Sequence, residues 1–425
     1  MATKVIVVGA GAAGLMAAGR AAERGGSVLL LEKMSEAGKK ILVSGKERCN
    51  VTNVAPIEPF IRHYGRNGQF LRNAFHRFFR EELRALLRRY GVETQVERGG
   101  RVFPTSGEAA DVRDALLRYA TESGAQVRYD APVAAILTEG GAVRGVRLRD
   151  GATLAADAVV VATGGASWPA TGSTGDGYRM AQEVGHAIVP LRPALVPLVV
   201  LEKSRAQALQ GLSLRHVHCT LLARKAEGAQ EKVITPPYPL PPTGEMLFTH
   251  FGVSGPLILT LSLGAVDALR AGKEVILSID LKPGMSAEEI RRRLQQEFEA
   301  HSKSWLHNLL RRWVPASLAD ELAKMSGVER ERAVHTIRAE ERDGLVQLLK
   351  GFRWQITGSL PLAAGMVTAG GVALKEVDPI TFASKVVPGL HLAGEVLDLA
   401  ADTGGYNLQA AFSTGYLAGE AAAAG

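Results

Sequence analysis

The feature that most constrains this 425-residue chain is a glycine-rich segment near its N-terminus, Gly9-Ala10-Gly11-Ala12-Ala13-Gly14. It follows a β-branched apolar run at residues 4–8 and precedes an alanine-rich stretch that ends near Arg24. A second apolar run, residues 28–31, ends in Glu32, 18 residues after Gly14. This order of strand, glycine turn, helix and acid-terminated strand is the βαβ unit that binds a dinucleotide.

Each glycine of the segment has its own physical role in such a unit. Gly9 permits the tight turn, Gly11 lets the backbone approach a diphosphate, and Gly14 lets the helix pack closely on the strand. The helix N-terminus offers free N–H groups and a partial positive charge to the diphosphate, and Glu32 accepts hydrogen bonds from ribose hydroxyls. The segment alone does not distinguish FAD from NAD.

Later segments favour FAD. Residues 162–165, Ala-Thr-Gly-Gly, follow a buried run at 159–161 in the manner of the second flavin-contact turn of flavoproteins. Residues 389–398 match a C-terminal flavin-contact segment, in which a strand delivers a glycine and an acid to the ribityl chain and diphosphate. Residues 403–409 then open a helix whose positive end would stabilise a reduced, anionic flavin. Three such segments in this order predict FAD held by both ends of the chain.

Five further segments carry a resemblance to a known family: residues 38–53, 100–104, 171–177, 247–256 and 404–408. On these residues the chain resembles the BaiN/RdsA family of bacterial, aminoacetone-oxidase-like flavoproteins over nearly its whole length. Two positions depart from the family pattern. Lys46-Glu47 stands where the family usually has a small residue and a glycine, and residues 382–385 read Phe-Ala-Ser-Lys where Met-Glu-Ser-Lys is more usual.

The resemblance implies an FAD-binding core with an inserted β-barrel-like and helical domain, and hydride exchange at flavin N5. It implies activities that include reduction of uridine to dihydrouridine in ribosomal RNA, reduction of a steroid double bond, and amine oxidation. NADH or NADPH is the implied reductant. Because no second glycine fingerprint is visible, we expect it to dock transiently in the substrate cleft.

We therefore predict an α/β fold in which a Rossmann-type FAD-binding domain is formed by both chain ends around an insertion. The prolines at 190, 193 and 197 mark where the insertion begins. The predicted parts are the N-terminal FAD-binding segment at 1–190, a β-rich insertion at 191–285, a helical insertion at 286–350 and the C-terminal FAD-binding segment at 351–425. Within them we expect one amphipathic helix at 69–90, a β-meander at 127–161, and strands over 195–282 with a proline-rich loop at 236–242.

The charge distribution and the two cysteines limit which partners and ligands we expect for this chain. The formal net charge is +7, and residues 60–118 contain twelve arginines, no lysine and seven acids. This surplus suits phosphate recognition, so ribosomal RNA is one expected partner, although the helical repeat Arg80, Arg84 and Arg88 is also typical of a solvated helix face. The sequence has no long apolar run or secretory signal, and its two cysteines form no zinc pattern. We expect a cytoplasmic protein without membrane segments or metal.

Two residues are candidates for the chemistry. Cys49 either protonates the carbon opposite the hydride acceptor or is a buried packing thiol, whereas Cys219 is expected in the core. His250 is either a substrate contact and proton donor or a structural loop residue. Lys40 and Arg48 either bind flavin or substrate phosphate or are solvated charges.

The residues expected to contact FAD are Gly9, Ala10, Gly11, Ala12, Ala13, Gly14, Glu32, Lys33, Lys40, Asn50, Val133, Ala162, Thr163, Gly164, Gly394, Glu395, Asp398, Gly404, Gly405, Tyr406, Asn407 and Leu408. Three functions remain open at this point. They are a reductase of uridine in 23S ribosomal RNA, a flavin reductase or oxidase of a small enone-type or amine metabolite, and a flavin-bearing RNA-binding protein with little turnover.

Overall fold

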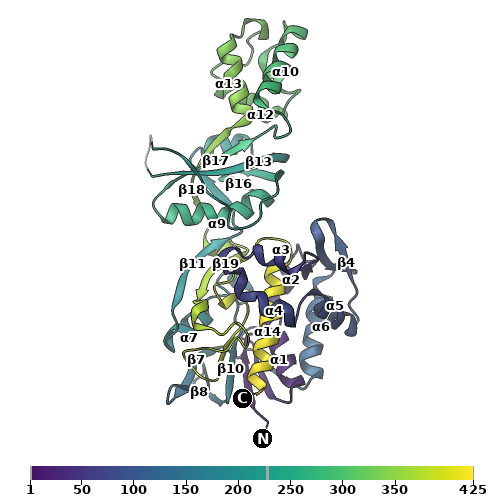
Figure 1. The fold of residues 1–425 in the computed structure, drawn as a ribbon, viewed down its shortest axis with the longest axis vertical. Coiled ribbons are helices and arrows are strands. Elements are labelled where there is room, and N and C mark those ends of the chain that lie inside the picture. The colour runs from purple at the N-terminus through teal and green to yellow at the C-terminus, as the bar shows by residue number, and fades with distance from the viewer. Residues whose placement is uncertain (1, 226–228, 425) are drawn as a thin grey trace. The chain divides into compact units, whose positions relative to one another are not determined.

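A computed structural model describes residues 2–225 and 229–424 of the chain (Figure 1). The chain forms two compact units. The first contains residues up to Ala194 together with those from Pro361 onward, and the second is Leu195–Leu360. The predicted insertion, 191–350, differs from this second unit at both ends. Strand β11 (Ile188–Ala194) pairs with β19 (Val367–Val372) in the first unit, while β18 (Phe352–Ser359) pairs with strands of the second.

A five-stranded parallel sheet forms the centre of the first unit. Its order is β20 (Leu390–Leu392), β10 (Ala158–Val161), β1 (Lys4–Val8), β2 (Ser27–Leu31) and β6 (Gln126–Arg128). The inner strands β1, β2 and β10 are largely apolar on both faces because both faces are covered, as is usual in parallel sheets, whereas the edge strand β6 is polar. From β1 the chain extends the sheet first through β2 and β6, and later on the other side through β10 and β20. The predicted Rossmann arrangement is confirmed, with its switch point between β1 and β10.

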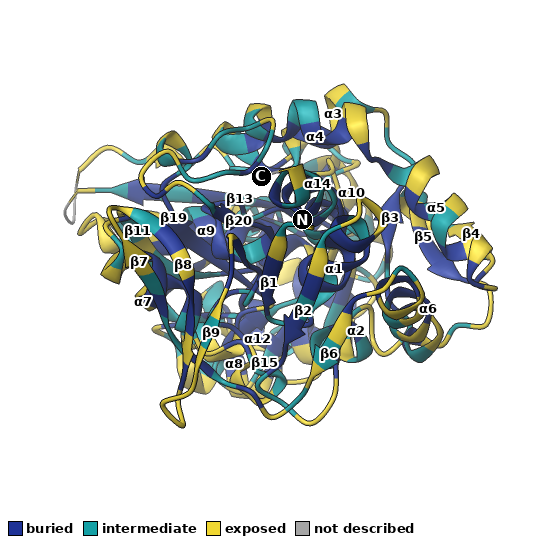
Figure 2. Cartoon of the chain, turned by 90° about the horizontal axis from the view of Figure 1, so that it is seen from below, coloured by how far each residue is buried: buried dark blue, intermediate teal, exposed yellow. Residues whose placement is uncertain are grey.

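Helices α1 (Ala12–Glu23), α6 (Ala109–Glu122) and α14 (Tyr406–Ala424) lie side by side in the first unit (Figure 1). α1 and α14 approach so closely that only glycine fits at the crossing. A Cβ at Gly415 would lie 2.3 Å from the Ala13 carbonyl oxygen, and one at Gly419 would lie 2.2 Å from that of Ala17. The first and last helices of the chain therefore form one packed pair, and the strands beneath are buried (Figure 2).

The predicted meander is smaller than expected. It contains β7 (Val133–Glu139), β8 (Ala142–Leu148) and β9 (Thr153–Ala155), with Asp150-Gly151 in the turn between β8 and β9. Its predicted ends, β6 and β10, belong instead to the parallel sheet.

The remaining helices and strands of the first unit are α2 (Lys39–Val43), β3 (Thr52–Asn53), α3 (Ile57–Arg62), η1 (Gly65–Leu71), α4 (Arg72–Arg77), α5 (Arg80–Arg89), β4 (Thr94–Glu97), η2 (Arg98–Gly100), β5 (Arg101–Pro104), η3 (Pro169–Thr171), α7 (Asp176–Glu183), η5 (Leu362–Ala364), η6 (Leu374–Glu376) and η7 (Gly394–Val396).

The prediction of one helix over 69–90 is wrong. The region is divided among η1, α4 and α5, and the break between the two α-helices falls at Phe78 and Phe79, both in extended backbone. The free N–H of Phe79 is satisfied by the Glu82 carboxylate at 2.9 Å. Phe78 stacks on Tyr416 with centroids 4.4 Å apart, so aromatic packing against α14 overrides the helical pattern.

The second unit contains a closed ring of antiparallel strands. β12 (Leu198–Val200), β18, β17 (Glu274–Asp280), β13 (Ser213–Arg224), β15 (Gly244–Thr249) and β16 (Gly252–Ser254) pair in sequence, and β16 pairs again with β12. A short strand, β14 (Lys232–Val233), is added to β13. The ring agrees with the β-barrel-like insertion that the resemblance implied.

The prediction of strands over 195–282 missed two helices, a short one at 203–208 and α9 (Pro256–Arg270), whose residues Leu257, Ile258 and Leu261 are buried in the core of the second unit. The continuous apolar run of α9 is also typical of a buried strand, and periodicity does not separate the two. Apart from α9, the helices of this unit are α8 (Lys203–Ala208), α10 (Ala287–Ala300), α11 (Leu306–Leu310), α12 (Ala316–Met325), η4 (Val334–Thr336) and α13 (Ala339–Lys350). Across residues 2–225 and 229–424, no helix is both long and apolar enough to span a membrane.

Candidate FAD site

The carboxyl ends of four parallel strands bring the predicted dinucleotide segments to one edge of the sheet. Gly9 follows β1, Glu32 follows β2, Ala162 follows β10 and Gly394 follows β20 after one residue. Ligands of open α/β sheets bind at this edge, beside the switch point. The topology therefore gathers segments that are more than 380 residues apart in the sequence, since Gly394 lies 385 positions after Gly9.

The glycines have the geometry that a dinucleotide turn requires. Gly9 has φ 98°, and a Cβ there would lie 2.7 Å from the Ala162 carbonyl oxygen. A Cβ at Gly14 would lie only 1.7 Å from the Gly9 carbonyl oxygen, so α1 packs directly on the turn. Gly11 differs from both, since a Cβ there would meet no atom within 4 Å. The space in front of Gly11 is therefore open, whereas the space around Gly9 and Gly14 is filled by protein.

Glu32 is buried and held in place by backbone. One carboxylate oxygen accepts the Ala10 N–H at 2.7 Å, and the other accepts the Met34 N–H at 2.9 Å. Its carbonyl oxygen accepts the N–H of Ala131, two residues before Val133, which places the start of β7 beside it. Lys33 has another partner, because its ammonium bonds to Asp176 at 2.7 Å and to Thr174 at 2.5 Å.

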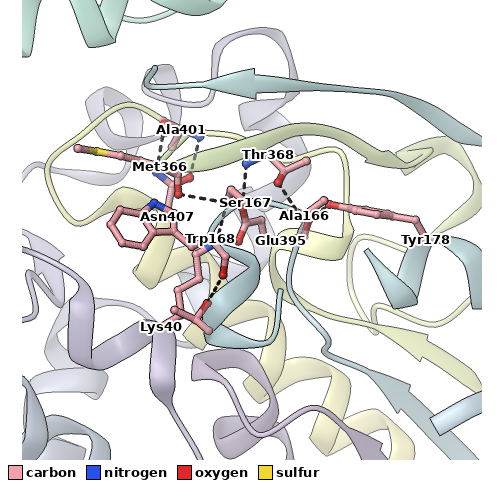
Figure 3. A network of polar contacts seen from close by, with 11 residues as sticks. Lys40, Ala166, Ser167, Trp168, Tyr178, Met366, Thr368, Glu395, Ala401 and Asn407 are labelled. Carbon is pink, nitrogen blue, oxygen red and sulfur yellow. Dashed lines mark hydrogen bonds and ion pairs between the residues drawn. The ribbon is translucent and has the colours of Figure 1, made fainter. Parts of the chain in front are cut away.

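Lys40 and Glu395 contact each other in a polar network that joins three segments (Figure 3). The Lys40 ammonium lies 2.6 Å from one Glu395 carboxylate oxygen and 2.9 Å from the hydroxyl of buried Ser167. The other oxygen accepts the Thr368 N–H at 2.8 Å and the Ser167 hydroxyl at 3.3 Å. The network thereby ties α2 to the turn after β10 and the turn after β20.

Ser167 and Thr368 were missed by the sequence reasoning. Ser167 comes two residues after the Gly164-Gly165 turn, which was a usable signal. Thr368 lies inside the fully buried strand β19, where nothing in the sequence distinguishes it from a core residue.

The segment from Asp398 to the start of α14 folds back on itself through backbone contacts. Asp398 accepts the Gly370 N–H at 3.1 Å and an amide N–H of Asn67 at 3.1 Å. The side chain of Asn407 bonds to both backbone groups of Ala401, at 2.9 and 3.0 Å. These side chains shape the loop that leads into the helix.

Gly404 and Gly405 supply left-handed backbone, with φ 125° and 95°, at the start of α14. A Cβ on Gly405 would lie 2.4 Å from the Thr52 carbonyl oxygen, so this turn rests on β3. Tyr406 stacks on His63 with ring centroids 3.9 Å apart, and burial together with the negative charge of Asp402 raises its pKa to about 12. Leu408, in the first turn of the helix, is partly buried.

Cys49 lies in a loop with an unusual backbone. Gly45, Lys46, Glu47 and Cys49 all have positive φ, at 59°, 59°, 65° and 55°. The Cys49 side chain is fully buried, and this burial raises the pKa of its thiol to about 12. The thiol therefore stays protonated at neutral pH. Its burial favours the packing interpretation over direct contact with a substrate. Cys219 is buried in the core of the second unit, as expected.

His250 belongs to the second unit, in the turn between β15 and β16. It is exposed, and its ring meets that of Phe251 edge to face with centroids 5.0 Å apart. The structure therefore places the two catalytic candidates in different units. Arg48 pairs with Glu97 and lies over the ring of Phe103, so this arginine is engaged within the first unit.

Comparison with known proteins identifies the family. A family model described as the HI0933-like protein Rossmann domain matches residues 3–421. The 3-dehydro-bile acid delta(4,6)-reductase of Clostridium scindens is 31% identical over 99% of both chains. The chain belongs to the HI0933-like family. A ribosomal RNA dihydrouridine synthase of Haemophilus influenzae, 31% identical over 97% of this chain and 96% of that protein, is a further relative.

The solved structure of a 3-ketosteroid-delta4-(5alpha)-dehydrogenase from Rhodococcus jostii has a similar fold. Its TM-score is 0.51 at 16% identity, over 99% of this chain and 96% of that one. Membership of the HI0933-like family makes this protein an FAD-dependent oxidoreductase, in agreement with the resemblance seen in the sequence.

The residues of this HI0933-like chain fit FAD at the strand edge. The N-terminus of α1 has no side-chain cap and no acid in its first turn, so its N–H groups remain available for a diphosphate. Gly11 leaves open space beside them. Two buried polar atoms of residues predicted to contact FAD, Asn50 Oδ1 and Thr163 Oγ1, have no hydrogen-bond partner within the described chain. Buried polar groups are normally satisfied, and a polar cofactor would supply the missing partners.

Proposed function

We propose that this protein is an NAD(P)H-dependent reductase that saturates the C5–C6 double bond of a uridine in 23S ribosomal RNA, in the cytoplasm, to give dihydrouridine. The observation that carries the proposal is the near full-length similarity to a ribosomal RNA dihydrouridine synthase. The arginine surplus of residues 60–118 supports a nucleic-acid partner. The uracil ring is an enone-like acceptor, for which a hydride donor is chemically suited.

FAD, when bound, supplies hydride transfer from its N5 position. In the proposed complex, the free N–H groups of α1 and the open space at Gly11 receive the diphosphate. Glu32, already held by two backbone N–H groups, offers its remaining lone pairs to ribose hydroxyls. The predicted FAD contacts of the turns after β10 and β20 complete the binding site. The Lys40–Glu395 pair connects α2 to the turn after β20.

The start of α14 contributes a positive helix end on the flavin side of the site. Gly404 and Gly405 fix the loop before this helix, because a Cβ there would meet the Tyr406 ring at 2.8 Å and the Thr52 carbonyl oxygen at 2.4 Å. A uridine inside a helix is stacked on its neighbours and must leave the stack before its ring can face a flavin. We therefore expect the substrate to be a single-stranded or extruded uridine.

The proton that completes the reduction needs a donor, and Cys49 and His250 remain the two candidates. Cys49 holds its proton firmly, because its pKa is about 12, and its side chain is shielded from solvent. His250 is exposed and mounted on a turn of the second unit. Cys49→Ala separates the possibilities. Full turnover with FAD bound would remove Cys49 as the donor, whereas loss of turnover with intact FAD content would support it.

The function is tested by measuring dihydrouridine, by mass spectrometry, in ribosomal RNA from cells with and without the gene. We expect the modification at one or more uridines to disappear in the deletion strain and to return with the wild-type gene. Without an artificial electron acceptor, the purified protein should oxidise NADH or NADPH rapidly only when an unmodified ribosomal RNA fragment is present. Unchanged dihydrouridine in the deletion strain would contradict the proposal.

A second candidate is reduction of an enone-type small molecule, or oxidation of an amine. The similarity to a bile acid reductase over 99% of the chain favours the reduction of an enone. The two functions differ in salt dependence, because binding of RNA phosphates weakens steeply as salt rises whereas binding of an uncharged enone does not. Steady-state turnover of an enone at a rate that RNA does not alter would favour this second function.

A further inference from the structure

In the folded protein, most arginines of the arginine-rich segment, residues 60–118, form ion pairs. Eight of its twelve arginines pair with carboxylates of the same unit. The paired arginines are Arg72, Arg77, Arg80, Arg84, Arg88, Arg89, Arg113 and Arg118. They include the helical repeat that first suggested RNA contact.

The other four, Arg62, Arg66, Arg98 and Arg101, are exposed. Within the described part of the first unit, none of them has a carboxylate at ion-pair distance. We call these four the rim arginines. Since exposed ion pairs leave little net positive potential, the unpaired charge of the segment is concentrated in them.

One pair of rim arginines lies beside Gly404. Arg98 and Arg101 enclose the Gly99-Gly100 turn, and the Nε of Arg101 donates to the Arg98 carbonyl oxygen at 3.0 Å. Asn53, opposite Arg101 in the β3–β5 pairing, donates from its amide to the carbonyl oxygens of both Gly99 and Gly404, at 3.0 and 3.2 Å. A single side chain thus links the arginine turn to the loop before α14.

The other pair, Arg62 and Arg66, lies next to residues that contact the same loop. Arg62 ends α3, and the next residue, His63, stacks on Tyr406 and accepts the Asp402 N–H at its carbonyl oxygen, at 3.0 Å. Arg66 precedes Asn67, whose amide donates to the Asp398 carbonyl oxygen at 2.7 Å. α3, which ends at Arg62, and β5, which begins at Arg101, lie on the same side of the first unit (Figure 2).

We propose that the rim arginines bind phosphodiester groups of a single-stranded RNA segment that presents its base at the loop 398–406. Guanidinium groups match phosphate oxygens in a two-point contact, and exposed arginines without a carboxylate partner make that contact without first breaking an ion pair. This inference rests on the proposed function for the identity of the strand as the substrate. The binding surface itself follows from the charge and position of the rim arginines.

The test compares two variants that lose the same formal charge. The rim variant carries Arg62→Gln, Arg66→Gln, Arg98→Gln and Arg101→Gln. The control carries Arg77→Gln, Arg88→Gln, Arg89→Gln and Arg118→Gln, which are exposed arginines of the same segment that have carboxylate partners. Binding of a single-stranded ribosomal RNA fragment is measured from low to high salt, together with FAD content and the KM for NADH with an artificial electron acceptor.

We expect the rim variant to bind RNA roughly 100-fold more weakly at about 0.15 M salt, and its plot of log affinity against log salt to be shallower by about 3. The control should change much less, and FAD content should be unchanged in both variants. Equal losses in the two variants would overturn the inference, because net charge alone would then explain binding. So would an unchanged RNA affinity in the rim variant, including the case in which only its KM for NADH rises.

The inference and the proposed function fail differently. If wild-type protein binds RNA through the rim arginines but forms no dihydrouridine, the proposed reaction is wrong and the binding surface stands. If the rim variant forms dihydrouridine with wild-type kcat/KM, the reaction stands and the binding surface is wrong.

Discussion

The glycine turn after β1 and the loop at residues 45–49 are both backbone devices of the first unit, but they manage conformational strain in opposite ways. At the turn, the positive φ falls on Gly9, where no side chain opposes it. In the loop, Lys46, Glu47 and Cys49 adopt positive φ although each carries a Cβ. Such residues cost about 1 kcal/mol or more each, so surrounding contacts must hold them.

Contacts of that kind surround the loop. The Cys49 N–H donates to the Ser44 carbonyl oxygen at 3.0 Å, and the Ala109 N–H donates to the Glu47 carbonyl oxygen at 3.0 Å. The dinucleotide turn thus has a relaxed backbone that tolerates no added atoms at Gly9 and Gly14. The loop is strained but leaves the side chains of Lys46 and Glu47 exposed. Strain of this kind concentrates at sites where position matters, which is consistent with a role for the loop beside the substrate.

The largest effect is expected from breaking the turn with Gly14→Ala. The added Cβ would lie 1.7 Å from the Gly9 carbonyl oxygen, so α1 must move away from β1. We expect a loss of about 3 kcal/mol or more in stability, together with loss of bound FAD. Urea unfolding and the ratio of flavin to protein after purification measure the two effects. A variant that kept wild-type stability and full FAD content would show that the turn is less tightly packed than the structure indicates.

Acid should lower the stability of the first unit through protonation of His391. This residue lies in β20, the strand that leads to Gly394. Burial lowers the pKa of this imidazole from 6.5 to about 4. The unfolded chain therefore binds the proton more readily, and folded stability falls as the pH drops from about 6.5 towards 4. The loss attributable to His391 is about 3 kcal/mol over that window.

The measurement is the free energy of unfolding as a function of pH. In His391→Gln its slope between about pH 6 and 4.5 should be shallower by up to about 1.4 kcal/mol per pH unit. His76→Gln, an exposed histidine of the same unit, is the control and should leave the slope unchanged. Equal slopes for wild type and His391→Gln would rule out this histidine as a source of acid sensitivity.

Gly11→Val sharpens the comparison by separating ligand binding from folding within one turn. A Cβ at Gly11 meets no protein atom within 4 Å, and the residue has an ordinary φ of −81°. We expect near wild-type stability without FAD but FAD binding weaker by roughly 10- to 100-fold, equivalent to about 1.4–3 kcal/mol. Titration of the apoprotein with FAD, followed by flavin fluorescence, gives the affinity. Unchanged affinity would place the diphosphate away from Gly11.

The contrast between the two regions also explains which parts were predictable. The turn is encoded locally, because Gly9 has φ 98° and Gly14 packs against the Gly9 carbonyl oxygen, so a short pattern captures both. The parallel sheet was predictable for the same reason, because short apolar runs precede the recognisable turns. The break at Phe78 and Phe79 was not predictable in this way, because its aromatic partners Tyr416 and Phe60 come from other parts of the chain.

The side-chain network was predictable only in part. Lys40 and Glu395 were each assigned to FAD, and the structure pairs them with each other through Ser167. Their contact joins positions 355 residues apart, and such a pairing depends on the packed sheet rather than on any local pattern. The ion pairing of the arginines was unpredictable for the same reason, because no stretch of sequence shows which of the twelve arginines in residues 60–118 lie beside a carboxylate.

The smallest effect is expected from relieving strain in the loop. Glu47→Gly removes a Cβ from a residue with φ 65°, which favours the folded state, while glycine also gains freedom in the unfolded chain. The balance predicts a stabilisation of roughly 0.5–1 kcal/mol. Glu108→Gly is the matched control, since Glu108 has φ −107° and gains nothing from glycine there, so it should lose roughly 0.5 kcal/mol.

Both variants are compared by urea unfolding, with turnover measured alongside. If strain in the loop serves the substrate, Glu47→Gly should be more stable yet slower, whereas Glu108→Gly should keep its rate. A destabilised Glu47→Gly variant would mean that the exposed carboxylate makes contacts worth more than the strain it carries. A stabilised variant with unchanged turnover would mean that the strained backbone is tolerated by the fold and serves no purpose in the reaction.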